Sequence, residues 1–250
     1  MAGSRPPHRF LISTDQVHES TITIDSPQEL RHIQTVLRLT VGDQVRCFDG
    51  TGAEYLGTIE QQTKRALVVR IDRRIQPTGG ELTLWLAQGL LKAERFEWVV
   101  QKATELGVSR LTPLVTAHTV IRLTEDQGRA KAARWRRIAQ EAAKQCGRPT
   151  VPHIDEPQPF KTLMASLQPG GLVLIPTLSM TTIPLADALK TVGRVADVTL
   201  LIGPEGDFTR DEVSDAQAHG ARPVSLGPLT LRSETAAVAG LAMLRYAFGH

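Results

Sequence analysis

Short apolar runs separated by turn residues fill the first 74 residues of the chain. These runs are RFLIS, STITI, QVRCFDG, AEYLGTIE and ALVVRI. Apolar and polar residues alternate within them, and Gly, Asp and Thr bound them, as in half-buried β-strands. The pattern predicts a small β-rich domain over residues 1–74, with the strands arranged as a barrel.

One helix is predicted to interrupt these strands. Ser26 is placed to cap it, and Pro27 takes the first helical position, where proline is favoured. Apolar residues then recur at helical spacing and predict one buried face, made of Leu30, Ile33, Val36 and Leu37.

The pattern changes at residues 75–80, which read IQPTGG. Proline and paired glycines disfavour both helix and strand, so this segment is predicted to be a linker. Strand and helix patterns then alternate through residues 81–250. The runs LVLIP and VTLLI are continuous and apolar, as in strands covered on both faces of a parallel sheet. The second domain is therefore predicted to be α/β.

Two helices early in this domain have readable ends. The first runs from residue 94 to 106 and is predicted to stop at Gly107, where a left-handed cap costs least. The second surrounds Trp135 and is predicted to stop at Gly147. Trp98 and Trp135 lie on or near the apolar stripes of these helices, so both are expected in the core rather than stacking on bases.

Two later helices begin with readable caps. Thr209 and Glu212 have the spacing of a capping box, and Gly220 is predicted to close that helix. Ser233 is expected to cap the last helix, TAAVAGLAMLRYAF. Its apolar residues run almost around the whole circumference, which predicts burial in the core or against a partner subunit.

Three Gly- or Pro-containing loops follow predicted strands of the second domain: IPTLSM, IGPEGDF and LGPLTLRSET. Ligands of open α/β sheets bind outside the carboxyl ends of the strands, so these loops are expected to converge on one pocket. Neither a P-loop nor a G-x-G-x-x-G fingerprint occurs, and G-x-S-x-G and H-E-x-x-H are absent as well. Nucleoside triphosphates, dinucleotides and the usual hydrolase chemistries are therefore disfavoured.

Composition excludes only a few classes of protein. Lys and Arg number 29 against 26 Asp and Glu, a net charge of +3 that does not by itself indicate nucleic acid. Cys47 and Cys146 stand far apart, with no Cys-x-x-Cys and no His pair at metal-ligand spacing. No stretch approaches the length of a membrane span. A cytoplasmic protein without a metal site is expected.

Four ordered segments then become specific: KAERFEWVVQKATELGVSRLTPL, RWRRIAQEAAKQCGRPTVP, LLIGPEGDFTRDEV and LGPLTLRSETAA. Together they resemble the uracil-N3 methyltransferases of small-subunit ribosomal RNA, members of the SPOUT class. RHIQTVLRLTVGDQVRCFDGTGAEY also resembles the family's N-terminal domain. The similarity covers essentially the whole chain.

The resemblance implies a PUA-like β-barrel followed by an α/β domain whose C-terminal segment forms a deep trefoil knot. It also implies a homodimer, S-adenosylmethionine (SAM) bound in the knot loops, and a uridine in the decoding region of an assembled small subunit as substrate. Carried over by position, the cofactor-binding residues are Thr177, Leu178, Gly203, Pro204, Glu205, Gly206, Leu226, Gly227, Pro228 and Leu231.

Three positions depart from the family's usual pattern. Asp207 stands where the family commonly has a second Gly, and Ser233 where it has Thr. Arg31 and His32 replace a pair of histidines. Ser retains the hydroxyl of Thr, whereas Asp207 adds a carboxylate near the cofactor loop with no evident role.

Methyl transfer to uracil N3 requires removal of a proton and stabilisation of the anion spread over O2 and O4. Arg232 is the candidate for that stabilisation, because preorganised positive charge acts directly on developing negative charge. Alternatively, Arg232 pairs with Glu205 or Glu234 to brace the knot. Glu234 is the candidate base, or else a first-turn carboxylate favoured by the helix dipole. Glu205 is expected to orient backbone or cofactor.

Phosphate contacts would bind RNA in a salt-dependent way without specifying the base. For His32, an ordinary surface position competes with a role in stacking or phosphate contact. The candidate RNA-binding residues are Arg9, Arg31, His32, Arg38, Lys92, Arg95 and Arg148.

Two other functions compete with uracil methylation. One is ribose 2′-O methylation of RNA by an enzyme of the same class, which would need a base for a hydroxyl group. The other is RNA binding without catalysis, which the intact GPEG and LGP loops disfavour.

Overall fold

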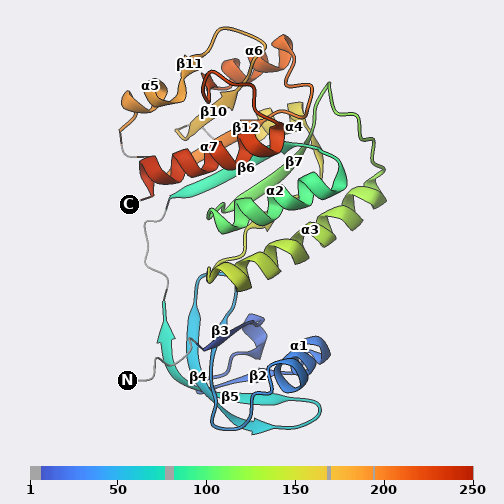
Figure 1. Cartoon of the computed structure of the whole chain (residues 1–250), viewed down its shortest axis with the longest axis vertical. Coiled ribbons are helices and arrows are strands. Elements are labelled where there is room, and N and C mark those ends of the chain that lie inside the picture. Colours follow the sequence, from blue (N-terminus) through green and yellow to red (C-terminus); the bar gives the residue numbers. More distant parts are fainter. Residues whose placement is uncertain (1–6, 77–81, 168–169, 194, 250) are drawn as a thin grey trace. The chain divides into compact units, whose positions relative to one another are not determined.

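The computed structural model describes residues 7–76, 82–167, 170–193 and 195–249 (Figure 1). The chain divides into two compact units. Unit 1 comprises Met1–Gly79 and Ala143–Val151, and unit 2 comprises Gly80–Ala142 and Pro152–His250. Of the predicted linker, residues 77–80 lie outside the described residues, and Ile75 is the last residue of a strand. The domain limits of 1–74, 75–80 and 81–250 stay a prediction.

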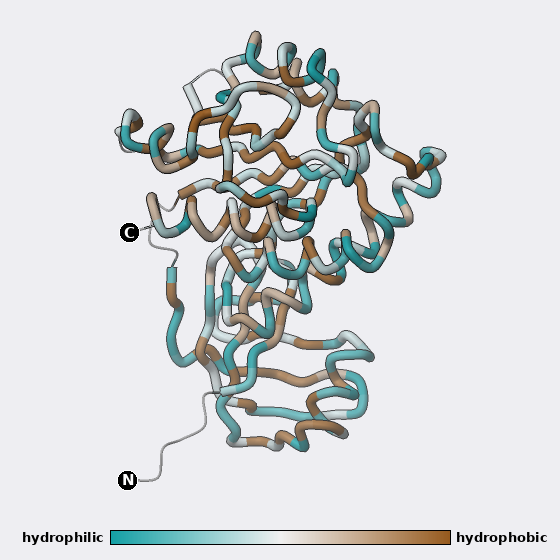
Figure 2. Tube along the Cα trace, turned by 45° about the horizontal axis from the view of Figure 1, so that its top comes forward, coloured by the Kyte–Doolittle hydropathy of each residue, from teal (hydrophilic) through white to brown (hydrophobic). Residues whose placement is uncertain are grey.

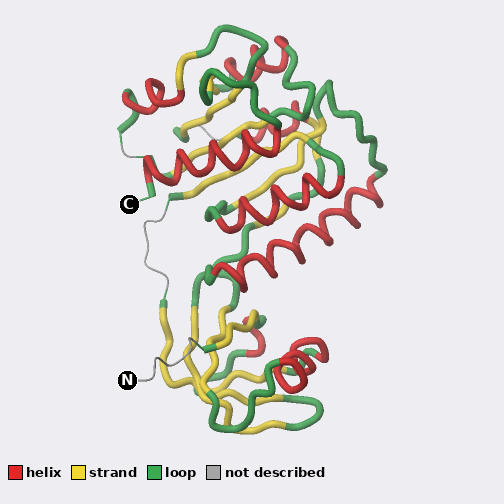
Figure 3. The backbone as a smooth tube through the Cα atoms, viewed as in Figure 1, coloured by secondary structure: helices red, strands yellow, loops and turns green. Residues whose placement is uncertain are grey.

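Unit 1 is built on one curled sheet of five strands (Figure 3). In chain order they are β1 (His8–Leu11), β2 (Thr21–Ile24), β3 (Gln44–Phe48), β4 (Glu54–Gln62) and β5 (Leu67–Ile75). The order in the sheet is β1-β3-β4-β5-β2, with β1 and β3 parallel and the other neighbours antiparallel. The alternating pattern puts residues such as Phe10, Val45 and Ile59 into the core. The five predicted strands are confirmed.

The helix of unit 1 differs from its prediction. It consists of α1 (Pro27–Arg31) followed by a π-helical turn over His32–Val36. Ser26 is the N-cap residue, although its side chain makes no capping hydrogen bond. The prediction of a buried Val36 is wrong, because this side chain is 67% exposed. The wider π-turn, closed by a bond of 3.0 Å from the Leu37 N–H to the His32 carbonyl, shifts the later residues off the α-helical register.

Unit 2 contains a parallel sheet, and Figure 2 shows its strands as largely hydrophobic. The strand order is β11-β13-β10-β12-β6-β7-β8, and the short β9 also pairs with β7. Their bounds are β6 (Thr83–Gly89), β7 (Arg110–Val115), β8 (His153–Ile154), β9 (Gln158–Pro159), β10 (Leu172–Pro176), β11 (Ile183–Pro184), β12 (Asp197–Ile202) and β13 (Ala221–Ser225). The long apolar runs form the central strands β10, β12 and β6, so the predicted α/β class is confirmed.

Helices cover both faces of this sheet (Figure 1). They are α2 (Ala93–Glu105), α3 (Glu125–Cys146), α4 (Phe160–Ser166), α5 (Leu185–Lys190), α6 (Arg210–Ala218) and α7 (Ser233–Phe248). α2 packs on α7, which contacts β6 and β12, whereas α4 and α6 pack together in a separate apolar cluster. α4 and α5 were not predicted, because one or two turns are too short for a periodic signal. Within the described ranges, no helix combines the length and apolar character needed to cross a bilayer.

The two tryptophans of the early helices have different environments. Trp135 is buried against Phe96, with 4.4 Å between ring centroids, as predicted. Trp98 is 41% exposed, so its predicted place in the core is wrong. The buried face of α2 contains Phe96 and Val100. Trp98 lies two residues from each, about 200° around the helix, and therefore points away from that face.

Gly107 ends α2 for two physical reasons. Its φ of +83° lies in the left-handed region, as the sequence predicted. A Cβ atom there would also lie 1.6 Å from Nη2 of Arg245 on α7. Arg245 donates to the carbonyls of Leu106 and Gly107, which fixes the end of α2 against α7.

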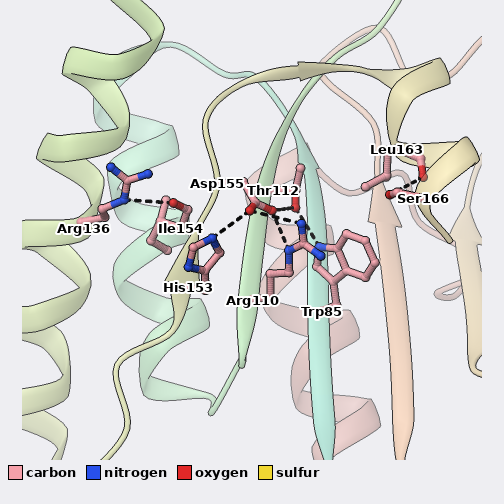
Figure 4. A network of polar contacts seen from close by, with 9 residues as sticks. All are labelled: Trp85, Arg110, Thr112, Arg136, His153, Ile154, Asp155, Leu163 and Ser166. Atoms are coloured by element: carbon pink, nitrogen blue, oxygen red, sulfur yellow. Dashed lines mark hydrogen bonds and ion pairs between the residues drawn. The ribbon is translucent and has the colours of Figure 1, made fainter. Parts of the chain in front are cut away.

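A polar network joins strands at one edge of the parallel sheet (Figure 4). Asp155 accepts hydrogen bonds from Arg110, at 2.7 Å, and from Thr112. His153 Nε2 lies 3.0 Å from the same carboxylate. Trp85 donates to Thr112 at 2.8 Å, so the network connects β6, β7 and the segment after β8.

The two cysteines have different environments, so we expect their thiols to differ strongly in reactivity. Cys47 is fully buried, and its burial together with the nearby charge of Glu29 raises the pKa of this thiol to about 12. Cys146 is exposed. Because the thiolate is the reactive form and Cys47 is shielded from solvent, we expect a thiol reagent at pH 8 to modify Cys47 far more slowly than Cys146 in the folded protein. Mass spectrometry after timed labelling measures this, with Cys146→Ser as the control that should lose the fast reaction. Equal rates at both thiols would contradict the buried position of Cys47.

Candidate functional site

A pocket of about 430 Å³ lies at the carboxyl ends of β10, β12 and β13. The three loops that the sequence singled out form its wall, so their predicted convergence is confirmed. Of the predicted cofactor-binding residues, those that line it are Thr177, Leu178, Gly203, Pro204, Glu205, Leu226, Gly227 and Leu231. Gly206 and Pro228 belong to the same loops but are not among the lining residues. The sequence did not single out Ser225, Leu229, Thr230 and Ala236, which line the pocket as well.

The loop after β12 rests directly on the end of β6. A Cβ atom on Gly89 would lie 2.4 Å from the backbone nitrogen of Pro204 and 2.7 Å from its Cδ. No side chain fits between these segments, so Gly89 is required for their close approach. The position of the GPEG loop is therefore set by the backbone of the central sheet.

A buried polar chain fixes the same loop to α7. Gln88 is fully buried on β6, and its Nε2 donates to Ser233 Oγ at 2.9 Å. Ser233 in turn donates to the carbonyl of Gly203. The prediction that Ser233 caps α7 is wrong: Arg232 is the N-cap residue, and the Ser233 hydroxyl is used to hold the loop. The only sequence signal for Gln88 was a polar residue at the end of an apolar strand.

Asp207 joins two walls of the pocket. Its Oδ2 accepts hydrogen bonds from Thr177 Oγ1 at 2.8 Å and from the N–H of Leu178 at 2.7 Å. Its Oδ1 accepts from the N–H of Phe208 at 2.7 Å. The carboxylate without an evident role in the sequence therefore connects the loop after β10 to the loop after β12.

Arg95 of α2 lines the pocket beside two acidic residues. The sequence suggested an RNA contact for Arg95, but it lines this pocket. Its Nη1 lies 3.4 Å from Glu205, and its Nε lies 3.8 Å from Glu234. The Glu234 side chain is 15% exposed, and its Oε2 is buried without a hydrogen-bond partner among the described residues. Arg95 thus partly neutralises two carboxylates.

Arg232 is an exposed residue of the pocket wall at the start of α7. Within the described part of the chain, its guanidinium makes no ion pair or hydrogen bond. The two acidic residues that could have braced it, Glu205 and Glu234, face Arg95 instead. The pocket therefore presents a cation that is available to a ligand.

The remaining RNA-binding candidates differ in accessibility. Arg9 pairs with Glu54, and its guanidinium lies 4.9 Å from the centroid of the Phe48 ring, which leaves its side chain only 15% exposed. This placement does not favour a phosphate contact for Arg9. Arg148 is half-buried and donates to Thr150. The exposed candidates are Arg31, His32, Arg38 and Lys92. RNA contact stays a prediction for all of them.

Two family models match the chain. A model described as an RNA methyltransferase domain matches residues 79–245, which include every wall of the pocket. A model described as an RNA methyltransferase PUA domain matches residues 24–72, which comprise the helix and most of the curled sheet of unit 1. The predicted order of a PUA-like domain and a methyltransferase domain is thereby confirmed.

Individual relatives and solved structures agree with these family matches. Ribosomal RNA small subunit methyltransferase E from Synechocystis sp. is 32% identical over 241 residues, which cover 95% of this chain and 77% of the relative. The protein of the same name from Bacillus subtilis is 28% identical, covering 94% of each chain. A methyltransferase from Legionella pneumophila, solved with bound SAM, is 32% identical, with a TM-score of 0.86 over 98% of this chain and 100% of that chain. The chain belongs to the RNA methyltransferase family whose members include ribosomal RNA small subunit methyltransferase E.

Proposed function

We propose that this protein transfers the methyl group of SAM to N3 of a uridine in small-subunit ribosomal RNA, with the assembled subunit in the cytoplasm as substrate. The observation that carries the proposal is a pocket built from the three family loops, with the unpaired cation Arg232 in its wall. Family membership supports RNA methylation, and the resemblance of the sequence to uracil-N3 enzymes supports the position of the methyl group.

The pocket residues fit SAM as a ligand. A volume of about 430 Å³ is within the usual range for small-molecule sites. Leu178, Leu226 and Leu231 supply apolar surface, and the Gly and Pro residues of the loops bring backbone groups within reach of an adenine edge. The relative from Legionella pneumophila, which has the same fold, was solved with bound SAM. When bound, SAM supplies an activated methyl group.

The acceptor is activated by charge in this proposal. Loss of the N3 proton leaves an anion spread over O2 and O4 of the uracil. The Arg232 guanidinium keeps its charge at all relevant pH values and presents a fork of N–H donors to such oxygens. Since no carboxylate of the described residues pairs with it, its charge acts on the acceptor without first breaking an ion pair.

A proton must leave N3 in the same reaction. Glu234 is in the first turn of α7, mostly buried, and close to Arg95. It is not among the residues that line the pocket, which favours its role as a first-turn carboxylate. We therefore assign the main catalytic contribution to Arg232 rather than to a base at Glu234.

A homodimer is part of the proposal. The packed helices α2 and α7 expose large hydrophobic side chains, with Trp98 and Met243 each 41% exposed and Tyr246 82% exposed. We propose that a partner covers these side chains. A second copy of the chain is the partner that the family resemblance implies.

The first prediction concerns catalysis. With labelled SAM and small subunits that lack the modification, the wild type should produce N3-methyluridine, identified by nuclease digestion and mass spectrometry. Arg232→Ala should lower kcat by roughly 10²–10³-fold, because a preorganised charge is lost. SAM affinity should change little, because the charge acts on the acceptor. Arg222→Ala, an exposed arginine of β13 outside the pocket, is the matched control and should retain activity.

Other products would contradict parts of this proposal. A ribose-methylated nucleotide as product would show that the enzyme methylates the 2′-O position instead of uracil N3. If the folded protein never binds SAM, RNA binding without catalysis would be the remaining function. Naked ribosomal RNA as the better substrate would overturn the requirement for an assembled subunit. Full activity in Arg232→Ala would remove Arg232 from the mechanism.

The second prediction concerns the support of the pocket. Gly89→Ala should push the GPEG loop away from β6, because its Cβ would overlap the backbone of Pro204. We expect SAM affinity, measured by calorimetry, to fall at least about tenfold. Gly128→Ala on α3 is the control. Its Cβ would lie at an ordinary contact distance of 3.5 Å from Cδ of Pro157, so this variant should bind SAM normally. Unchanged affinity in Gly89→Ala would show that the loop does not depend on this contact.

The third prediction concerns association. Met243→Glu should weaken the dimer, because a charge would be buried in an apolar interface. Sedimentation velocity over a range of concentrations should then detect monomer, while Val120→Glu, at an 89% exposed position outside α2 and α7, should behave as the wild type. A monomeric wild type would disprove the homodimer.

A further inference from the structure

Asp207 has a backbone conformation that few residues other than glycine adopt easily. Its φ of +58° lies in the left-handed region, which glycine adopts freely and Asp tolerates. Glycine would satisfy the turn after β12 without any side chain. The presence of Asp here therefore calls for an explanation from the carboxylate itself.

Neutral groups hold this carboxylate in place. Its three hydrogen-bond donors are the hydroxyl of Thr177 and the backbone N–H groups of Leu178 and Phe208. These donors carry no net charge, so they do not cancel the charge of the carboxylate. The side chain is half-buried and lines the pocket, so its charge is felt inside it.

The cations that line or adjoin the pocket do not pair with Asp207, and the unpaired Arg232 is one of them. Arg95 faces Glu205 and Glu234. Arg210 donates to the carbonyl of Ser179, and the ring of His118 contacts the backbone carbonyl of Asp207, not its carboxylate. Among the described residues, Asp207 forms no ion pair with a cation. It is therefore an uncompensated negative charge in the pocket wall.

We propose that Asp207 makes the pocket select the positively charged methyl donor over its neutral product. This inference rests on the proposed function. In the reaction, the bond from sulfur to the methyl carbon breaks, a bond from uracil N3 to that carbon forms, and the N3 proton passes to solvent water. The sulfur keeps the electron pair and becomes a neutral thioether. SAM thus enters with one more positive charge than S-adenosylhomocysteine has when it leaves.

The uncompensated carboxylate attracts SAM and has no such attraction for the product. At the distances available across a small, partly solvated pocket, one charge pair changes an affinity by roughly three- to tenfold. Asp207 therefore lowers product inhibition, because SAM competes more effectively with S-adenosylhomocysteine for the pocket. Glycine at this position would suit the backbone but would remove the charge and, with it, the discrimination.

The test is a comparison of two dissociation constants in each variant, measured by calorimetry with SAM and with S-adenosylhomocysteine. Asp207→Asn removes the charge with little change in shape, and Asp207→Gly gives the family's usual residue, which suits the backbone. Both variants also weaken the link between the two loops. The two ligands differ only in the methyl group and the charge that it gives the sulfur, so we expect that effect to act on both and to cancel in the ratio of the two constants.

We expect the preference for SAM over S-adenosylhomocysteine to fall roughly three- to tenfold in both variants. Asp211→Asn is the matched control, because it removes the same charge from α6 outside this pocket. It should keep the wild-type ratio. If the ratio of the two dissociation constants stays unchanged in a folded Asp207→Gly protein, even with an equal loss of affinity for both ligands, the proposed selectivity is overturned. Failure of the wild type to bind either ligand would instead disprove the proposed function.

Discussion

The close contact between the end of β6 and the loop after β12 is the constraint on which the pocket depends. Gly89 allows the two backbones to touch, and Gln88 beside it reaches through Ser233 to the carbonyl of Gly203. One point on the central sheet therefore positions the loop and the first turn of α7 together. Burial makes this arrangement strict, since a buried amide or hydroxyl without its partner is costly.

The pairing of charges around the pocket follows from this arrangement. α2 packs on α7, which brings Arg95 close to Glu234 at the first turn and to Glu205 of the loop. Each of these carboxylates is thereby removed from Arg232. The hydrogen bonds to Asp207 likewise come only from neutral groups. Packing of the helices therefore determines which charges remain available to a ligand.

Much of the fold was predictable because periodicity reports burial directly. The long strands, the ends of α2 and α3 at Gly107 and Gly147, and the capping box at Thr209 were found from the pattern alone. Within the pocket, the sequence misjudged residues whose roles depend on contacts distant in sequence. Ser233 had the pattern of a helix cap, but its hydroxyl accepts a hydrogen bond from Gln88, 145 residues away. The bonds of Asp207 likewise reach back to a different loop, which no local pattern encodes.

The two unpaired charges of the pocket have a common consequence under the proposed reaction. The donor brings a cation and the acceptor becomes an anion, and methyl transfer cancels both. Arg232 and Asp207 have the opposite signs, so each binds a reactant more strongly than the corresponding product. A pocket in which all charges were paired would hold reactants and products equally well. Leaving one cation and one anion without partners thus makes the pocket hold the charged reacting species more strongly than the neutral products.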